Sequence, residues 1–112
     1  MILVKAQLKY LRIAPRKVRL VADAIRRKKA GDASQMLNFM HLRPAKAMAK
    51  LLNSALANAR NNLNLDDSNL YIKEIRVDQG PVLKRFMPKA RGTAHPIRKK
   101  SSHITLILED KK

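Results

Sequence analysis

The sequence predicts an α+β fold that carries a long basic β-hairpin arm, and three patterns indicate it. Apolar and polar residues alternate near the start of the chain and again in its second half, as in half-buried strands. Three segments between these stretches repeat their apolar residues at helical spacing. Residues 80–100 contain three Pro, two Gly and seven Lys or Arg, and are too polar to pack as a core. Strands that flank a block of helices are typical of the α+β class.

The first strand is expected over Val4–Tyr10, with an apolar face formed by Val4, Ala6, Leu8 and Tyr10. Ala14 and Pro15 then open a helix, because proline suits the first helical position. The apolar face of this helix consists of Val18, Val21, Ala22 and Ile25. Gly31 is expected to end it, since glycine is common just beyond a helix.

Two further helices are expected before residue 63. Asp32 and Gln35 resemble a capping box for a short helix that would bury Ala33, Met36, Leu37 and Met40. Pro44 starts a longer helix that runs to about Asn62. Its apolar positions keep helical spacing and predict the central helix of the core: Met48, Leu52, Ala55, Leu56, Ala59 and Leu63.

Two strands are expected in the second half of the chain. Leu70–Val77 is rich in β-branched and aromatic residues, but its apolar residues change phase between Ile72 and Ile75. A β-bulge or a strand contacted on both faces would explain the change, and the sequence leaves both open. His103–Leu108 alternates regularly, with Ile104, Leu106 and Leu108 on one face.

The length and composition fit one soluble domain. The 112 residues are expected to form a globular part, residues 1–79 with 101–112, and an arm over about 80–100. Because there is no Cys, disulfides and thiolate metal sites are excluded. The start MILVKAQLKY lacks a signal-peptide pattern, and no segment approaches the roughly 20 apolar residues of a membrane span. We therefore expect an unprocessed cytoplasmic protein.

The positive charge is concentrated in two parts of the chain. There are 25 Lys and Arg against 8 Asp and Glu, a formal charge of +17. Residues 1–31 hold ten basic residues and one acid, and residues 79–108 hold seven basic residues and no acid. A solvated surface usually mixes both signs. The distribution therefore predicts a polyanionic partner, with nucleic acid as the leading candidate.

Residues 80–100 are expected to form an arm that becomes ordered on this partner. As a hairpin folded near 91–93, it would project about 30 to 35 Å. No recognition-helix, basic-zipper or zinc-finger pattern is present, so recognition of folded RNA by its shape fits better than reading of a DNA sequence. The residues expected to bind RNA are Arg12, Arg16, Lys17, Arg19, Arg26, Arg27, Lys84, Arg85, Lys89, Arg91, Arg98, Lys99 and Lys100. A protein that coats DNA without sequence preference remains the alternative.

Catalytic and metal-binding patterns are absent from the sequence. His41, His95 and His103 are scattered and show no metal-ligand spacing. The three glycines do not form a phosphate-binding loop. We therefore expect no enzyme activity, no metal and no cofactor.

Three stretches together resemble one family: YLRIAPRKVRLVAD at residues 10–23, LNSALANARNN at 52–62, and GPVLKRFMPKARGTAHPIRKKSSHITL at 80–106. In this order they are similar to the bacterial-type large-subunit ribosomal protein family L twenty-two. The resemblance covers nearly the whole chain, and its most specific part is the arm followed by SSHIT.

This resemblance implies a three-stranded antiparallel sheet packed on three helices. It also implies a structural protein of the large ribosomal subunit that binds 23S-type rRNA, contacts neighbouring ribosomal proteins and aids assembly. Its hairpin would line the exit tunnel and meet the nascent peptide. The tip that would line the tunnel comprises Met87, Pro88, Lys89, Ala90, Arg91, Gly92, Thr93, Ala94, His95 and Pro96.

Overall fold

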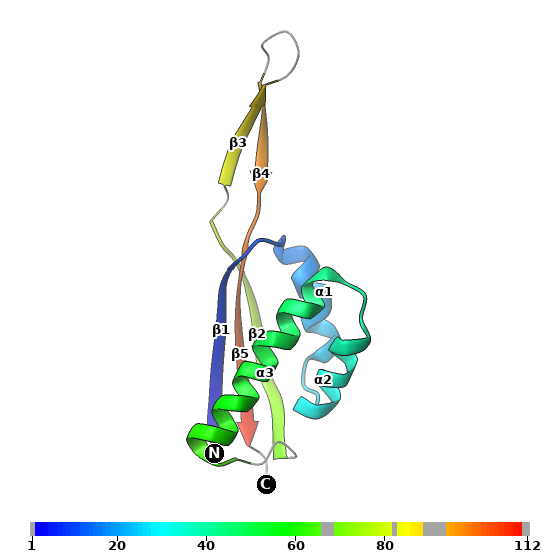
Figure 1. The fold of residues 1–112 in the computed structure, drawn as a ribbon, viewed down its shortest axis with the longest axis vertical. Coiled ribbons are helices and arrows are strands. Elements are labelled where there is room, and N and C mark those ends of the chain that lie inside the picture. Colours follow the sequence, from blue (N-terminus) through cyan, green and yellow to red (C-terminus); the bar gives the residue numbers. More distant parts are fainter. Residues whose placement is uncertain (1, 66–68, 82, 89–93, 111–112) are drawn as a thin grey trace.

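The computed structural model describes residues 2–65, 69–81, 83–88 and 94–110. Figure 1 shows the elements in chain order: β1 (Leu3–Leu11), α1 (Pro15–Ile25), α2 (Ala30–Phe39), α3 (Arg43–Leu63), β2 (Leu70–Gln79), β3 (Leu83–Pro88), β4 (Ala94–Lys99) and β5 (Ser102–Asp110). The α+β class predicted from the sequence is confirmed.

One antiparallel sheet contains β1, β5 and β2 in that order, so β5 is central and the other two strands lie at the edges. The three helices pack along one side of this sheet (Figure 1). A second, two-stranded sheet formed by β3 and β4 continues beyond its end. The three-stranded sheet, the three helices and the hairpin all agree with the fold that the family resemblance implied.

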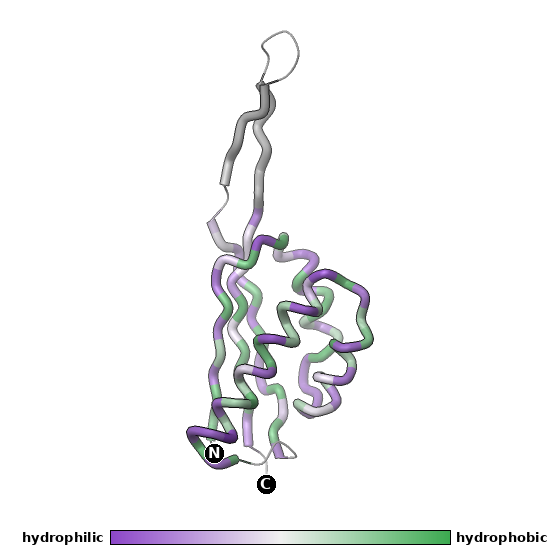
Figure 2. The backbone as a smooth tube through the Cα atoms, viewed as in Figure 1, coloured by the Kyte–Doolittle hydropathy of each residue, from purple (hydrophilic) through white to green (hydrophobic). Residues whose placement is uncertain are grey.

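The core is aliphatic and lies between the helices and the sheet. Figure 2 shows hydrophobic and hydrophilic residues alternating along β1 and recurring along α3. The helices contribute Val18, Val21, Ile25, Met48 and Leu52, all fully buried. The sheet contributes Leu70, Ile72, Ile75, Ile104, Leu106 and Leu108, each at most 1% exposed. The predicted apolar faces of α1 and β5 are therefore confirmed.

The change of phase in β2 comes from a β-bulge, one of the two alternatives left open by the sequence. Ile72 lies opposite Leu108 and Glu74 lies opposite Ile107, so Lys73 is an extra residue in β2. The extra residue turns the apolar side chains that follow it back toward the core. As a result, Ile75 and Val77 are buried, with exposures of 1% and 8%.

The boundary between α1 and α2 differs from the prediction. α1 ends at Ile25 rather than near Gly31, and α2 begins at Ala30 without a side-chain cap, so Asp32 lies in its first turn rather than in a capping box. The reason is tertiary pairing. Ile72 of β2 donates a backbone hydrogen bond of 2.9 Å to the carbonyl of Lys28, and Lys29 pairs with Tyr71. The segment between the helices thus covers the open edge of β2.

Two residues predicted to be buried are exposed. Tyr10 is 64% exposed with φ of 60°, because β1 contains a bulge between Leu8 and Leu11. Its N–H donates to Nδ1 of His103 at 3.0 Å, and the two rings meet edge to face. Leu63 is 45% exposed at the last position of α3.

Candidate nucleic-acid interface

α1 presents basic side chains to solvent because its apolar face packs on the core. Val18, Val21, Ala22 and Ile25 are fully buried, which leaves the basic positions around them facing outward. All the predicted RNA-binding residues whose exposure the structure describes are exposed: Arg12, Arg16, Lys17, Arg19, Arg26, Arg27 and Lys100. The only acid on α1 is Asp23. The exposed cations from Arg12 to Arg27 are called the α1 surface.

Arg19 and Arg26 also hold the edge of β2. Arg19 Nη2 donates to the carbonyl of Val77 at 3.0 Å, and Arg26 Nη1 donates to the carbonyl of Ile75 at 2.9 Å. These carbonyls lie on an edge strand, where a guanidinium supplies the donor that a neighbouring strand would supply. Arg26 Nη2 also pairs with Asp23 at 3.1 Å. Each guanidinium has five N–H donors, so both retain donors for a second partner.

The start of α1 is electrostatically suited to an anion. Arg16 and Lys17 lie in the first turn, which contains no acid, and the N-cap residue Ala14 makes no side-chain cap. Cations at this end oppose the helix dipole, so the arrangement costs stability in the free protein. A bound anion would relieve this cost.

This helix start lies beside the base of the arm. A cleft of about 220 Å³ is lined by Pro15, Arg16, Arg19, Gln79 and Lys100. The fold therefore brings together cations of the two basic stretches, which are far apart in the sequence. Arg27 lies elsewhere, in a cleft of about 190 Å³ with Tyr71, Lys73 and Glu109.

The arm is a regular antiparallel ribbon over its described part. Lys84 lies opposite Arg98, Leu83 opposite Lys99, and Arg85 opposite Ile97. The register therefore places basic positions on both strands of the same ribbon.

The predicted tip divides into two parts. Met87 and Pro88 lie in β3 and pair with His95 and Ala94 of β4, and Pro96 pairs with Phe86. Proline is tolerated here because both strands of a two-stranded ribbon have an open edge. The remaining tip residues, Lys89, Ala90, Arg91, Gly92 and Thr93, lie outside the described residues.

The junction between sheet and arm was not singled out by the sequence analysis. The N–H of Gly80 donates to the carbonyl of Ser101 at 2.9 Å, and Ser101 Oγ donates to the carbonyl of Pro81 at 2.8 Å. The buried hydroxyl of Ser102 donates to the carbonyl of Ile13 at 2.7 Å. These bonds fix the direction in which the arm leaves the sheet. The sequence signal was a Gly-Pro pair facing a Ser-Ser pair, which becomes readable only once the strand register is known.

No cluster of three or more potential metal ligands occurs within residues 2–65, 69–81, 83–88 and 94–110. His103 has a structural contact, since its Nδ1 accepts the Tyr10 N–H. In the part of the chain that the structure describes, no helix has the length and apolar character needed to cross a membrane.

The fold and the site together define a basic α+β domain with a projecting hairpin. Residues 6–109 match the family model described as Ribosomal protein L22p/L17e. The chain belongs to this family, as the resemblance indicated.

Curated relatives cover almost the whole chain. It is 50% identical over 107 residues to the large ribosomal subunit protein uL22 of Syntrophus aciditrophicus, covering 96% of this chain and 97% of that protein. The same identity holds over 108 residues with the uL22 proteins of Pelotomaculum thermopropionicum and Bdellovibrio bacteriovorus, covering 96% of this chain in both cases and 96% and 98% of the relatives.

Proposed function

We propose that this chain is a non-enzymatic structural constituent of the large ribosomal subunit in the cytoplasm. The observation that carries the proposal is the 50% identity to large-subunit proteins over 96% of the chain. It would act by charge neutralisation and shape fit, because its surface offers cations rather than a general acid paired with a general base.

Large-subunit rRNA is the proposed partner of the α1 surface and the arm. The cations of the α1 surface are exposed, and its single acid, Asp23, is already paired with Arg26. The arm adds six Lys and Arg between residues 83 and 99 without an acid. Each phosphate contact would make binding more dependent on salt. Neighbouring large-subunit proteins would be further partners in the assembled particle.

We further propose that residues 1–79 with 101–112 form the globular part and that residues 80–100 form an arm reaching into the subunit. The tip at 87–96 would line the exit tunnel and meet the nascent peptide. Support comes from the family membership and from the continuation of β2 and β5 into a hairpin beyond the sheet (Figure 1).

Sedimentation tests the ribosomal proposal. The tagged protein is expected to stay with the large subunit in a sucrose gradient at high salt, because loose electrostatic coating dissociates steeply as salt rises. The Lys84→Glu/Arg85→Glu/Arg91→Glu variant is expected to remain folded and to be lost from the subunit. A matched control reverses the same number of charges at Lys28, Lys73 and Lys111 and is expected to be retained. Normal incorporation of the arm variant would contradict the role proposed for the arm.

Competition separates this function from non-specific coating of DNA. A coating protein would be displaced from rRNA by any duplex DNA, whereas a protein fitted to rRNA would be displaced only by its own RNA. Family membership favours the second result.

A further inference from the structure

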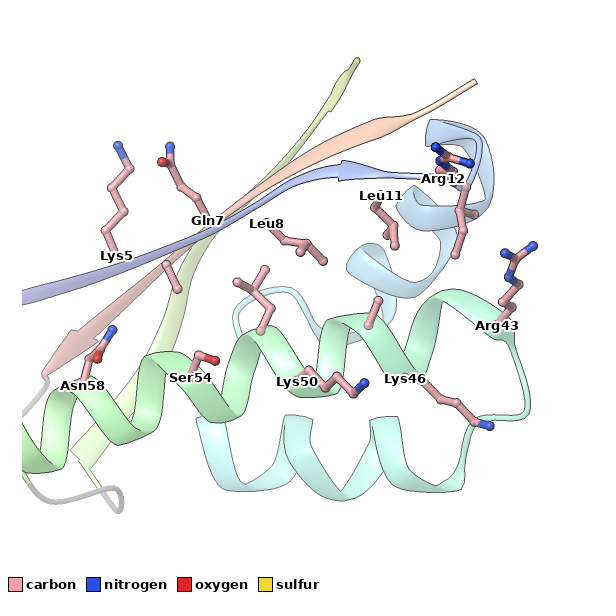
Figure 3. A pocket seen from close by; sticks show the side chains of 14 residues that line it. Lys5, Gln7, Leu8, Leu11, Arg12, Arg43, Lys46, Lys50, Ser54 and Asn58 are labelled. Atoms are coloured by element: carbon pink, nitrogen blue, oxygen red, sulfur yellow. The ribbon is translucent and has the colours of Figure 1, made fainter. Parts of the chain in front are cut away.

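A second basic surface lies between β1 and α3. Figure 3 shows it as a groove with β1 along one side and α3 along the other. Its volume is about 790 Å³. Arg12 and Arg43 stand together at one end, and Ser54 and Asn58 lie toward the other (Figure 3).

The lining residues include no acid and five cations, which are Arg12, Arg43, Lys46 and Lys50, together with Lys5, whose side chain points away from α3 (Figure 3). All five are exposed. Within the described ranges, none of them forms an ion pair. Arg12 belongs to the α1 surface, whereas Arg43, Lys46 and Lys50 on α3 constitute a separate concentration of charge.

The placement of these cations costs stability in the free protein. Arg43 is the first residue of α3, Lys46 follows one turn later, and the first turn contains neither an acid nor a side-chain cap. The positive end of the helix dipole therefore faces positive side chains. Arg43, Lys46 and Lys50 follow one another at intervals of three and four residues, so they share one side of the helix over roughly 10 Å. An extended polyanion along this side would neutralise both the dipole and the side chains.

The floor and the far end of the groove suit a sugar–phosphate chain. Leu8 and Leu11 are half-buried, which gives an apolar floor on which riboses can lie. Ser54 and Asn58 are exposed and supply hydrogen-bonding groups for phosphate oxygens or 2′-hydroxyls.

An acidic peptide fits the groove less well. Such a peptide would dock most readily by adding a strand to the open edge of β1. The bulge between Leu8 and Leu11, with Tyr10 at a φ of 60°, interrupts that edge where the groove runs toward Arg12. A bulge of this kind limits strand addition, whereas contacts to phosphates require no backbone pairing.

We propose that the groove between β1 and α3 binds the phosphodiester backbone of an RNA strand, through contacts separate from those of the arm. The proposal rests on the rRNA-binding function proposed above and assigns it a second surface, centred on Arg43, Lys46 and Lys50.

The first experiment measures binding to deproteinised large-subunit rRNA over a range of salt concentrations. The Lys46→Glu/Lys50→Glu variant is compared with Lys28→Glu/Lys73→Glu, which changes the net charge equally but alters exposed residues at the opposite edge of the sheet. The groove variant is expected to bind about tenfold more weakly than the control at moderate salt. The slope of log K against log salt should fall by roughly 0.7 to 0.9 for each phosphate that the variant no longer neutralises.

Thermal unfolding separates weakened binding from weakened folding. Because Lys46 lies near the positive end of α3, replacing it by Glu is expected to leave the Tm unchanged or to raise it. Weaker binding together with an unchanged or higher Tm supports the proposal. A groove variant that binds like its control overturns it while leaving the ribosomal function intact, whereas failure of the wild-type chain to bind rRNA overturns both.

A tethered cleavage reagent tests which molecule occupies the groove. The chain has no Cys, so Ser54→Cys provides a single attachment point within the groove and Lys73→Cys provides one outside it. An iron chelate at residue 54 is expected to cut bound rRNA at a few adjacent nucleotides that the chelate at residue 73 does not reach. No cutting from residue 54, or protection of this position by a polyglutamate peptide in place of RNA, overturns the proposal.

Discussion

Gly80 occupies a position where a side chain would disturb the base of the arm. A Cβ there would meet Ser101 Oγ too closely and would lie 3.2 and 3.3 Å from the ring atoms of His103. The Ser101 hydroxyl would have to turn away from the carbonyl of Pro81, which it binds at 2.8 Å. We expect Gly80→Ala to cost about 1 kcal/mol, the contribution of one hydrogen bond, and to lower the Tm by roughly 4 to 8 °C.

Gly31→Ala is the matched control for this substitution. A Cβ at Gly31 meets no atom within 4 Å, and the residue lies in α2. Alanine at such a position is expected to stabilise by about 0.4 to 1 kcal/mol, because the unfolded chain loses freedom. Urea denaturation of both variants measures the difference. Equal stability of Gly80→Ala and Gly31→Ala would contradict the role assigned to the junction.

At the scale of single elements, the bulge allows a test of what sets the register of β2. Without Lys73, Ile72, Glu74 and Ile75 would pair regularly with consecutive residues of β5. Deletion of Lys73 is therefore expected to change the free energy of unfolding by about 1 kcal/mol or less, because the residue is exposed and no apolar side chain changes face.

Deletion of Arg76 is the contrasting variant. It removes a residue from the regular part of β2, so either Ile75 or Val77 must turn outward, whichever way the strand slides. The loss of one buried aliphatic side chain is expected to cost roughly 1.5 to 3 kcal/mol. Urea unfolding midpoints measure both deletions, and equal effects would show that the register of β2 is not set by its apolar residues.

The elements were predictable from the sequence wherever one face of a helix or strand packs directly on the core. The periodicity of α1, α3 and β5 reports this burial, so their buried residues were predicted correctly except for Leu63 at the end of α3. The boundary near Lys28 was missed because pairing with β2, a long-range contact, ended α1 before Gly31. Helix propensity is a local property and does not include the effect of such a long-range contact.

The candidate interface was predictable only where charge is concentrated in the sequence. The α1 surface and the arm were found because residues 1–31 and 79–108 are almost free of acids. The groove was missed because residues 32–78 are nearly neutral in sum. The fold separates these charges: Glu74 and Asp78 lie on β2, whereas Lys46 and Lys50 lie on α3, which packs beside β1 at the opposite edge of the sheet.

At the scale of the whole molecule, the arm and the globular part are expected to be separable. The backbone contacts of β3 and β4 are mainly with each other, and the sheet closes at its own end through Gly80 and Ser101. Replacing residues 82–99 by an Asn-Gly turn removes six cations and keeps these closing bonds. We expect the shortened chain to fold with an equal or higher Tm, because self-repulsion falls and the connecting loop is shorter.

The same replacement is expected to abolish retention in the large subunit at high salt. If each of the six cations neutralises one phosphate, their removal lowers the salt slope of rRNA binding by roughly 4 to 5, so the affinity left at low salt would come from the α1 surface and the groove. Circular dichroism with thermal unfolding and sucrose-gradient sedimentation check the two halves of this prediction. Unfolding of the shortened chain would contradict the division into globular part and arm. Retention of a folded shortened chain would mean that the globular surfaces alone hold the protein in the subunit.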